Sequence, residues 1–231
     1  MKRFWTDVAT VPVEDGFRVQ LDGRDVRTPG KLLLTLPTQA LATRIAEEWD
    51  AQGEKLDPAS MPLTGFANAA IELIGRRRGE IVDTIAGYTE TDLLCYRAEG
   101  PAELQARQHA AWQPVLDWAE KDLGAGLATT QGIVPVVQDA AALAALRAQI
   151  DAVDDWALTG LNVLTHGLGS AVLGLAVILG RLDPDEAFQL SQLDELWQES
   201  QWGQDAEAAQ SREALRQRIL TAAVFVDLTR L

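Results

Sequence analysis

The feature that most constrains this chain is a 25-residue stretch, from Trp156 to Gly180, that carries no formal charge. Its length is sufficient to cross a bilayer. A polar stripe recurs along it at helical spacing: Thr159, Asn162, Thr165 and His166. A membrane span would leave that stripe in lipid, at a high cost in free energy. The glycines of His166–Gly169 are typical of a chain break. The sequence therefore predicts two buried helices separated at His166–Gly169.

The first 37 residues predict a small antiparallel sheet. Apolar and polar residues alternate in Phe17–Leu21, and Asp22-Gly23 is typical of a hairpin turn. After Thr38, which can N-cap a helix, apolar residues recur at helical spacing. We therefore predict an α+β fold, with a small N-terminal antiparallel β domain at residues 1–60. That domain has hairpins and a short helix, and a larger, mainly α-helical domain follows at residues 61–231.

One predicted helix near the C-terminus carries an unusual carboxylate. Asp183-Pro184 is typical of a helix start, and Gly203 can cap the end, which predicts a single helix of about 19 residues. Phe188, Glu195 and Trp202 are spaced by seven residues, so their side chains lie roughly along one line of that helix. A lone acid between two aromatic residues is either a solvated edge residue or a charge held for a partner.

Two further predictions concern local irregularities. Pro114 should kink or interrupt the helix that runs through Trp112 and Trp118, because proline removes a backbone donor and clashes with the preceding turn. The three arginines Arg76–Arg78 should lie on or near a solvated turn between two glycines. Without a phosphate-loop motif around them, a surface role is favoured over phosphate binding.

The charge and cysteine content exclude several classes of protein. A net charge of −14 argues against nucleic-acid binding, which depends on lysine and arginine, and against anionic membrane surfaces. The one cysteine, Cys95, can form neither an internal disulfide nor a multi-cysteine zinc site. Its apolar neighbours predict a buried and inert thiol. No apolar run typical of a secretory signal follows Met1, so we expect a cytoplasmic protein.

The sequence offers no support for catalysis. His109 and His166 each stand without an accompanying base or orienting acid, and no His, Asp and Glu residues have the spacing of a metal site. Nucleophile elbows, phosphate loops and dinucleotide fingerprints are missing from the sequence. We therefore expect no metal, no cofactor and no enzyme. The alternative is a hydrolase-like enzyme that uses a carboxylate in a helical cleft.

A set of short motifs occurs in order along nearly the whole chain: Arg3-Phe4-Trp5, Leu21-Asp22-Gly23-Arg24, Thr28-Pro29, Glu48-Trp49-Asp50-Ala51-Gln52, Met61-Pro62-Leu63-Thr64, Thr91 to Arg97, Trp112-Gln113-Pro114, and Gln198 before Trp202-Gly203. Each motif alone is weak, but the ordered set resembles the ATP synthase assembly-chaperone family that acts on the alpha subunit of the catalytic head. The resemblance implies the same α+β fold. It also implies a chaperone that binds free alpha subunit and prevents its aggregation before association with beta.

The resemblance also implies a site. Members of this family carry a functionally important glutamate shortly before the Trp-Gly pair, and the matching position here is Glu195. The partner-binding residues expected with it are Asp194, Gln198, Glu199, Trp202 and Phe188. Asp194 and Glu199 are the alternatives if the register of the motif is shifted. After Gly203 this chain departs from the mitochondrial relatives, so contacts beyond that point are not transferred.

Three interpretations of Glu195 remain open at this stage. A chaperone predicts an open apolar face around Glu195, and an enzyme predicts a closed pocket with a second polar group. A structural acid predicts burial against arginine or backbone donors. The expected partner is the unassembled alpha subunit, bound by a monomeric chaperone through protein–protein interaction. Neither nucleic acid nor stable membrane insertion is expected.

Overall fold

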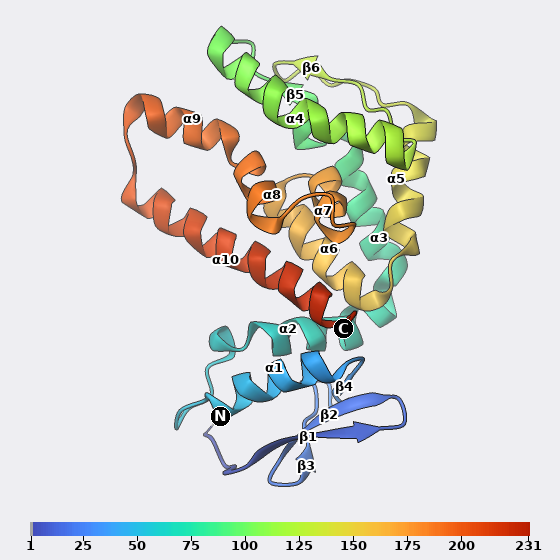
Figure 1. Cartoon of the computed structure of the whole chain (residues 1–231), viewed down its shortest axis with the longest axis vertical. Helices are drawn as coiled ribbons and strands as arrows, with labels where there is room; N and C mark the ends of the chain where they lie inside the picture. Colours follow the sequence, from blue (N-terminus) through green and yellow to red (C-terminus); the bar gives the residue numbers. More distant parts are fainter. Residues whose placement is uncertain (1) are drawn as a thin grey trace. The chain divides into compact units, whose positions relative to one another are not determined.

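The computed structural model describes residues 2–231 as a small antiparallel sheet followed by mainly helical elements (Figure 1). The predicted α+β fold class is confirmed. Spatial contacts divide the chain into two compact units. The first unit contains the chain up to Arg78, together with Asp155–Gly160 and Thr221–Leu231, and the second contains Gly79–Asp154 and Leu161–Leu220. The predicted domains at 1–60 and 61–231 stay a prediction.

The sheet of the first unit is antiparallel and centred on one strand. Its strands are β1 (Val8–Val13), β2 (Gly16–Leu21), β3 (Arg24–Asp25) and β4 (Thr35–Leu36). Strand β2 pairs with all three others, and Val8 lies opposite Leu21 in the β1–β2 ladder. Asp22 and Gly23 both have positive φ, +47° and +75°, as a two-residue hairpin of this twist requires. The predicted hairpin turn is therefore confirmed.

Helix α1 (Gln39–Asp50) packs against this sheet and contacts β1 and β2. The Thr38 hydroxyl accepts a hydrogen bond from the backbone N–H of Leu41 at 3.1 Å, which confirms the predicted N-cap. Leu41, Ile45 and Trp49 form the buried face of the helix. Their spacing of four residues places them on one side, so the helix covers the sheet with a continuous apolar stripe.

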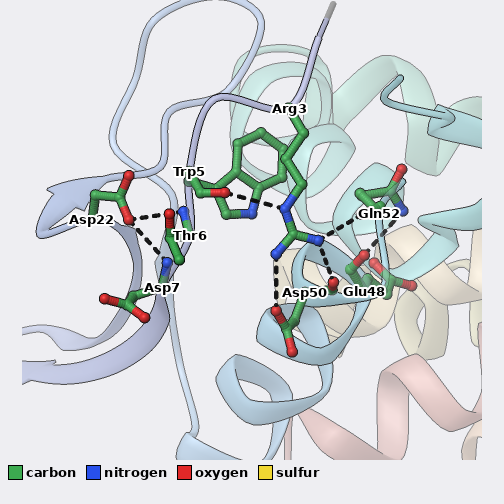
Figure 2. Close-up of polar contacts among 8 residues, drawn as sticks. All are labelled: Arg3, Trp5, Thr6, Asp7, Asp22, Glu48, Asp50 and Gln52. Carbon is green, nitrogen blue, oxygen red and sulfur yellow. Dashed lines mark hydrogen bonds and ion pairs between the residues drawn. The ribbon is translucent and has the colours of Figure 1, made fainter. Parts of the chain in front are cut away.

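A polar cluster ties the start of the chain to the end of α1 (Figure 2). The guanidinium of Arg3 donates to the backbone carbonyls of Trp5, Asp50 and Gln52 at 3.2, 2.7 and 2.6 Å, and to the Asp50 carboxylate at 3.1 Å. The last carbonyls of a helix have no intrahelical donor, so a cation here satisfies them and complements the helix dipole. The Asp22 carboxylate accepts hydrogen bonds from the backbone N–H groups of Thr6 and Asp7.

The carboxylate of Glu48 caps the next helix from the side of α1. Helix α2 (Pro62–Ala69) begins at a proline, after the 3-10 helix η1 (Pro58–Ser60). Glu48 accepts from the backbone N–H groups of Leu63 and Thr64, both at 2.8 Å, and from the Thr64 hydroxyl at 2.7 Å. The negative charge therefore satisfies orphan donors at the positive end of α2.

The three arginines do not form the predicted turn. A π-helix η2 (Ala70–Ile74) leads into α3 (Gly75–Glu90), and the backbone at Arg77 leaves helical geometry at φ −127° and ψ 26°. The break is therefore a kink inside a continuous helical region. Arg78, the last of the three, forms an ion pair with Asp155 at 2.6 Å.

The second unit is helical apart from two short parallel strands. Its remaining elements are η3 (Leu93–Cys95), β5 (Tyr96–Arg97), α4 (Ala102–Leu123), β6 (Thr130–Gln131), α5 (Ala140–Ala152), α6 (Asp155–Leu168), α7 (Ala171–Ile178), α8 (Pro184–Ser191), α9 (Leu193–Trp202) and α10 (Ala206–Leu228), of which α6 and α10 also contribute to the first unit.

Helix α4 runs through Pro114 without interruption, so the predicted interruption is wrong, and the alternative of a kink stays a prediction. Pro114 lies on the exposed side of the helix, while Trp112, Val115 and Leu116 are buried. The carbonyl of Ala110, which loses its donor to the proline, belongs to an exposed residue and can bind water. Burial of the opposite face therefore keeps the helix continuous.

The uncharged stretch forms two helices, as predicted. Helix α6 ends at Leu168, Gly169 has a φ of +66°, and Ser170 caps α7 by accepting from the backbone N–H of Leu173. All but one residue of α7 is buried, and α7 contacts α4, α5 and α8 within the second unit. Across residues 2–231, no helix is both long enough and apolar enough to span a membrane.

A buried carboxylate anchors the start of α7. Asp92 accepts from the Ser170 hydroxyl at 2.7 Å and from the backbone N–H groups of Leu94 and Val172, both at 3.1 Å. Burial raises the pKa of Asp92 to about 6, and these hydrogen bonds oppose that shift. Burial, together with the charge of Asp92, also raises the pKa of Cys95 to about 12. The predicted burial of this thiol is therefore confirmed, and its raised pKa supports the prediction that it is inert.

The single helix predicted over residues 184–202 is wrong, because it is divided into α8 and α9. Asp183 caps α8 as predicted, but helical geometry ends at Gln192, with φ −100° and ψ 11°. The carbonyl of Leu190 accepts a hydrogen bond from the indole Nε1 of Trp112 at 2.9 Å. This donor comes from α4, 78 residues away in the sequence, and it replaces an intrahelical partner at the end of α8.

Replacing Glu48 by alanine should destabilise the protein by roughly 2–3 kcal/mol, because two backbone donors at the start of α2 lose their acceptor. Urea unfolding followed by circular dichroism measures this loss. Glu47→Ala is the matched control, since Glu47 lies on the same helix, is exposed, and pairs with Arg44 at the surface. The control should change stability by less than about 0.5 kcal/mol. Equal effects of the two substitutions would contradict the capping role.

Asp92 should make stability fall as pH rises from about 4 to 7. Its folded pKa of about 6 lies above the ordinary value of 3.8, so the folded state holds a proton that the unfolded state has lost in that interval. The contribution is complete below pH 3.8 and is lost as pH passes 6. Relative to Asp92→Asn, which does not titrate, the free energy of unfolding of the parent protein should decrease by about 3 kcal/mol. If the free energies of unfolding of the two proteins change in parallel with pH, this prediction is wrong.

Candidate functional site

Helix α9 presents two different faces. Glu195, Gln198, Glu199 and Trp202 occupy positions i, i+3, i+4 and i+7, so they share one face. Asp194 and Trp197 lie on the other face, where Trp197 is buried. Of the six residues predicted for partner binding, four therefore come together on α9.

The back face of α9 is attached to α4. The side-chain amide of Gln108 donates to the carboxylate of Asp194 at 2.8 Å, and the guanidinium of Arg107 lies 4.7 Å from the centroid of the Trp197 ring. Asp194 is thus occupied by an internal hydrogen bond. Phe188 lies on α8, on the other side of the helix break, and is only 2% exposed. The predicted line of Phe188, Glu195 and Trp202 therefore does not form.

The front face of α9 is fastened to α10 by an ion pair. The Nη2 atom of Arg212 donates to both carboxylate oxygens of Glu199 at 2.7 and 2.8 Å. Both side chains are largely buried, with 16% of Arg212 and 20% of Glu199 exposed. Charges paired away from water interact more strongly than exposed ones, because screening is weaker there. This pair therefore fixes the distance between the two helices in the C-terminal half of α9.

The chain reverses direction between α9 and α10 over three residues, at the left of Figure 1. Gly203 has a φ of +91°, and its N–H donates to the carbonyl of Glu199 at 2.9 Å. A positive φ of this kind is unfavourable for residues with a Cβ atom. Asp205 then caps α10 by accepting from the backbone N–H of Ala208 at 2.8 Å. The predicted cap at Gly203 is confirmed.

A cleft of about 620 Å³ lies between the two helices. Its lining residues come from the Gln192 junction, α9, the reversal and α10: Gln192, Glu195, Gln198, Glu199, Trp202, Gly203, Asp205, Ala208, Ser211, Arg212 and Leu215. The residues from α10 were missed by sequence reasoning. The signal for them was Gly203, which indicates that the next helix returns alongside α9.

Glu195 and Trp202 are both exposed at this cleft. Trp202 is 81% exposed, although a tryptophan ring offers a large apolar surface. Glu195 is also exposed, and within residues 2–231 its carboxylate has no hydrogen bond or ion pair. The interpretation of Glu195 as a buried structural acid therefore does not fit its environment.

The part of the chain that the structure describes contains no group of three His, Cys, Asp or Glu residues able to hold a metal ion.

Comparisons with known proteins identify relatives of the whole chain. Residues 2–120 match the family described as ATP12 chaperone protein. The chain is 24% identical to the mitochondrial protein atp12 of Schizosaccharomyces pombe over 237 aligned positions, which cover 97% of this chain and 81% of that protein.

Solved structures agree with this match. The crystal structure of Atp12 from Paracoccus denitrificans is 43% identical, with a TM-score of 0.95 over 99% of this chain and 98% of that one. A protein from Agrobacterium tumefaciens is 41% identical, with a TM-score of 0.90 over 97% of this chain and 84% of that one.

The family match covers more than half of the chain, and the structural similarity extends over nearly all of it. The matching family is described as a chaperone protein, which sets aside the alternative of a hydrolase-like enzyme. The chain therefore belongs to the ATP12 chaperone protein family, the ATP synthase assembly-chaperone family that its sequence resembles, and it is a chaperone and not an enzyme.

Proposed function

We propose that this chaperone binds the unassembled alpha subunit of the ATP synthase catalytic head and prevents its aggregation until beta associates. The observation that carries the proposal is the α9–α10 cleft, in which Trp202 is exposed and Glu195 has no partner among the described residues. A free subunit exposes an apolar surface that its neighbour later covers. An exposed aromatic ring beside an open cleft can cover part of such a surface until assembly.

The arrangement of the cleft suits temporary binding of a protein surface. The cleft is lined along both helices by side chains of mixed character, with Trp202, Ala208 and Leu215 as its apolar part. Interfaces of transient complexes combine a few aromatic anchors with polar groups in this way. The fixed spacing given by the Glu199–Arg212 pair means that α9 need not be ordered on binding, which reduces the entropic cost.

We also propose that the protein acts in the cytoplasm as a monomer. The lone cysteine is buried and its thiol is held protonated, which suits a reducing compartment. The net charge of −14 opposes self-association. Size-exclusion chromatography with light scattering measures the oligomeric state directly.

Glu195→Gln should abolish suppression of alpha-subunit aggregation and leave folding intact. The carboxylate is exposed and bonded to no described residue, so its neutralisation removes no internal contact. The assay is light scattering after dilution of denatured alpha subunit into the chaperone, with the thermal midpoint as the check on folding. Glu207→Gln is the matched control, because Glu207 is an exposed acid on α10 outside the cleft lining.

A Glu195→Gln protein that protects alpha subunit normally, or one that unfolds, would contradict the assignment of the site. The identity of the client is tested separately by affinity purification of the tagged chaperone from cells. Recovery of alpha subunit without beta supports the proposed client. Recovery of assembled alpha and beta together, or of neither, argues against it.

A further inference from the structure

We infer that the α9–α10 cleft recognises a client segment carrying an arginine, which pairs with Glu195, and an apolar residue that lies on Trp202. This inference rests on the proposed role of the cleft in client binding. It specifies the chemistry of the bound segment, which the proposed function leaves open.

The residues that line the cleft carry more negative than positive charge. Its lining contains three carboxylates, Glu195, Glu199 and Asp205, and one cation, Arg212. Glu199 is neutralised by Arg212, and Asp205 is used to cap α10. Glu195 and Asp205 therefore keep their negative charge, and of these two lining residues Glu195 is the one without an internal hydrogen bond. Burying this carboxylate under an apolar or anionic client group would cost free energy without compensation, whereas a cation would compensate it.

The neighbours of Glu195 favour arginine over lysine. Gln192 and Gln198 precede and follow it by three residues, and both line the cleft. Each of their side-chain amides carries a carbonyl oxygen that can accept a hydrogen bond. A guanidinium has five N–H donors in a planar fork, and it is more weakly hydrated than an ammonium. A carboxylate flanked by two amides can therefore satisfy an arginine more completely than a single acceptor can.

The cleft already contains one pair of this kind. Glu199 lies one turn after Glu195 on the same face of α9, and it pairs with the guanidinium of Arg212. A carboxylate at this depth between the helices is therefore compatible with a guanidinium partner. Glu195 is also a glutamate on this face, but it is more exposed than Glu199, and α10 places no cation opposite it among the residues lining the cleft.

The separation of the two contact points defines the length of the bound segment. Glu195 and Trp202 are seven residues apart, which is about 10 Å along a helix axis. One side chain of the client cannot cover both points well, so two residues of the segment are required. The segment must present an arginine at the Gln192 end of α9 and a large apolar side chain near Gly203.

The experiment uses the full-length chaperone and overlapping 15-residue peptides that cover the alpha subunit, with binding measured by fluorescence anisotropy. Each bound peptide is then remade with its arginines replaced one at a time by citrulline, which is isosteric and neutral, or by lysine. One citrulline position should weaken binding at least tenfold, and lysine at that position should weaken it less. In the Glu195→Gln protein, the arginine and citrulline peptides should bind equally.

Two further variants separate the contacts. Trp202→Leu should weaken binding of the arginine and citrulline peptides by the same factor, because contacts about 10 Å apart contribute independently. Glu207→Gln should bind all peptides as the parent does. The inference is overturned if citrulline has no effect, or if the arginine preference survives in Glu195→Gln. It is also overturned if no peptide binds at concentrations up to about 1 mM, the Kd of a very weak complex.

The outcomes distinguish this inference from the proposed function. If protection against aggregation is lost in Glu195→Gln while citrulline has no effect, the site binds the client through other chemistry. If alpha subunit is neither recovered nor protected, the proposed client is wrong, whatever the peptides show.

Discussion

The second unit depends on the hydrogen bonds that the buried Asp92 carboxylate accepts at the start of α7. Helix α7 is almost completely buried, so the N–H groups at its start have no access to water. Asp92, which comes from a segment 78 residues earlier than Ser170, accepts from that serine and from the backbone at Val172. An unsatisfied donor in this position would cost as much as several favourable contacts provide. Once α7 is anchored, α4, α5 and α8 can pack around it.

Most of the motifs that suggested the family have structural roles. Arg3 binds carbonyls at the end of α1, Glu48 caps α2, and Asp92 caps α7. These residues lie within the part of the chain that matches the family, residues 2–120. The α9–α10 cleft lies after it. These three motifs therefore specify the scaffold, whereas the last motif, Gln198 with Trp202-Gly203, belongs to the cleft on the helical hairpin near the C-terminus.

The sequence predicted those features that depend on local chemistry. Helix caps at Thr38 and Asp183, the Asp22-Gly23 hairpin and the break at Gly169 each follow from residues a few positions apart. The end of α8 could not be predicted in this way, because the donor that satisfies Leu190 is the indole of Trp112 on another helix. No glycine or proline marks that position.

The candidate site was predictable in part, for the same reason. The spacing of Glu195, Gln198, Glu199 and Trp202 predicts a common face whether or not the helix continues back to Phe188. Which acid of α9 is free depends on partners elsewhere in the fold. Asp194 is occupied by Gln108 and Glu199 by Arg212, and neither contact has a local sequence signal.

The exposure of Trp202 has a consequence for the behaviour of the protein at high concentration. An aromatic ring that is 81% exposed would ordinarily promote association between identical chains. Here the cleft beside it is acidic and the whole chain carries a net charge of −14, so a second copy approaches with the same sign of charge. Electrostatic repulsion between two copies of the chain therefore disfavours their association. The Trp202 ring remains available to surfaces of other proteins. Raising the salt concentration weakens this protection before it affects the fold.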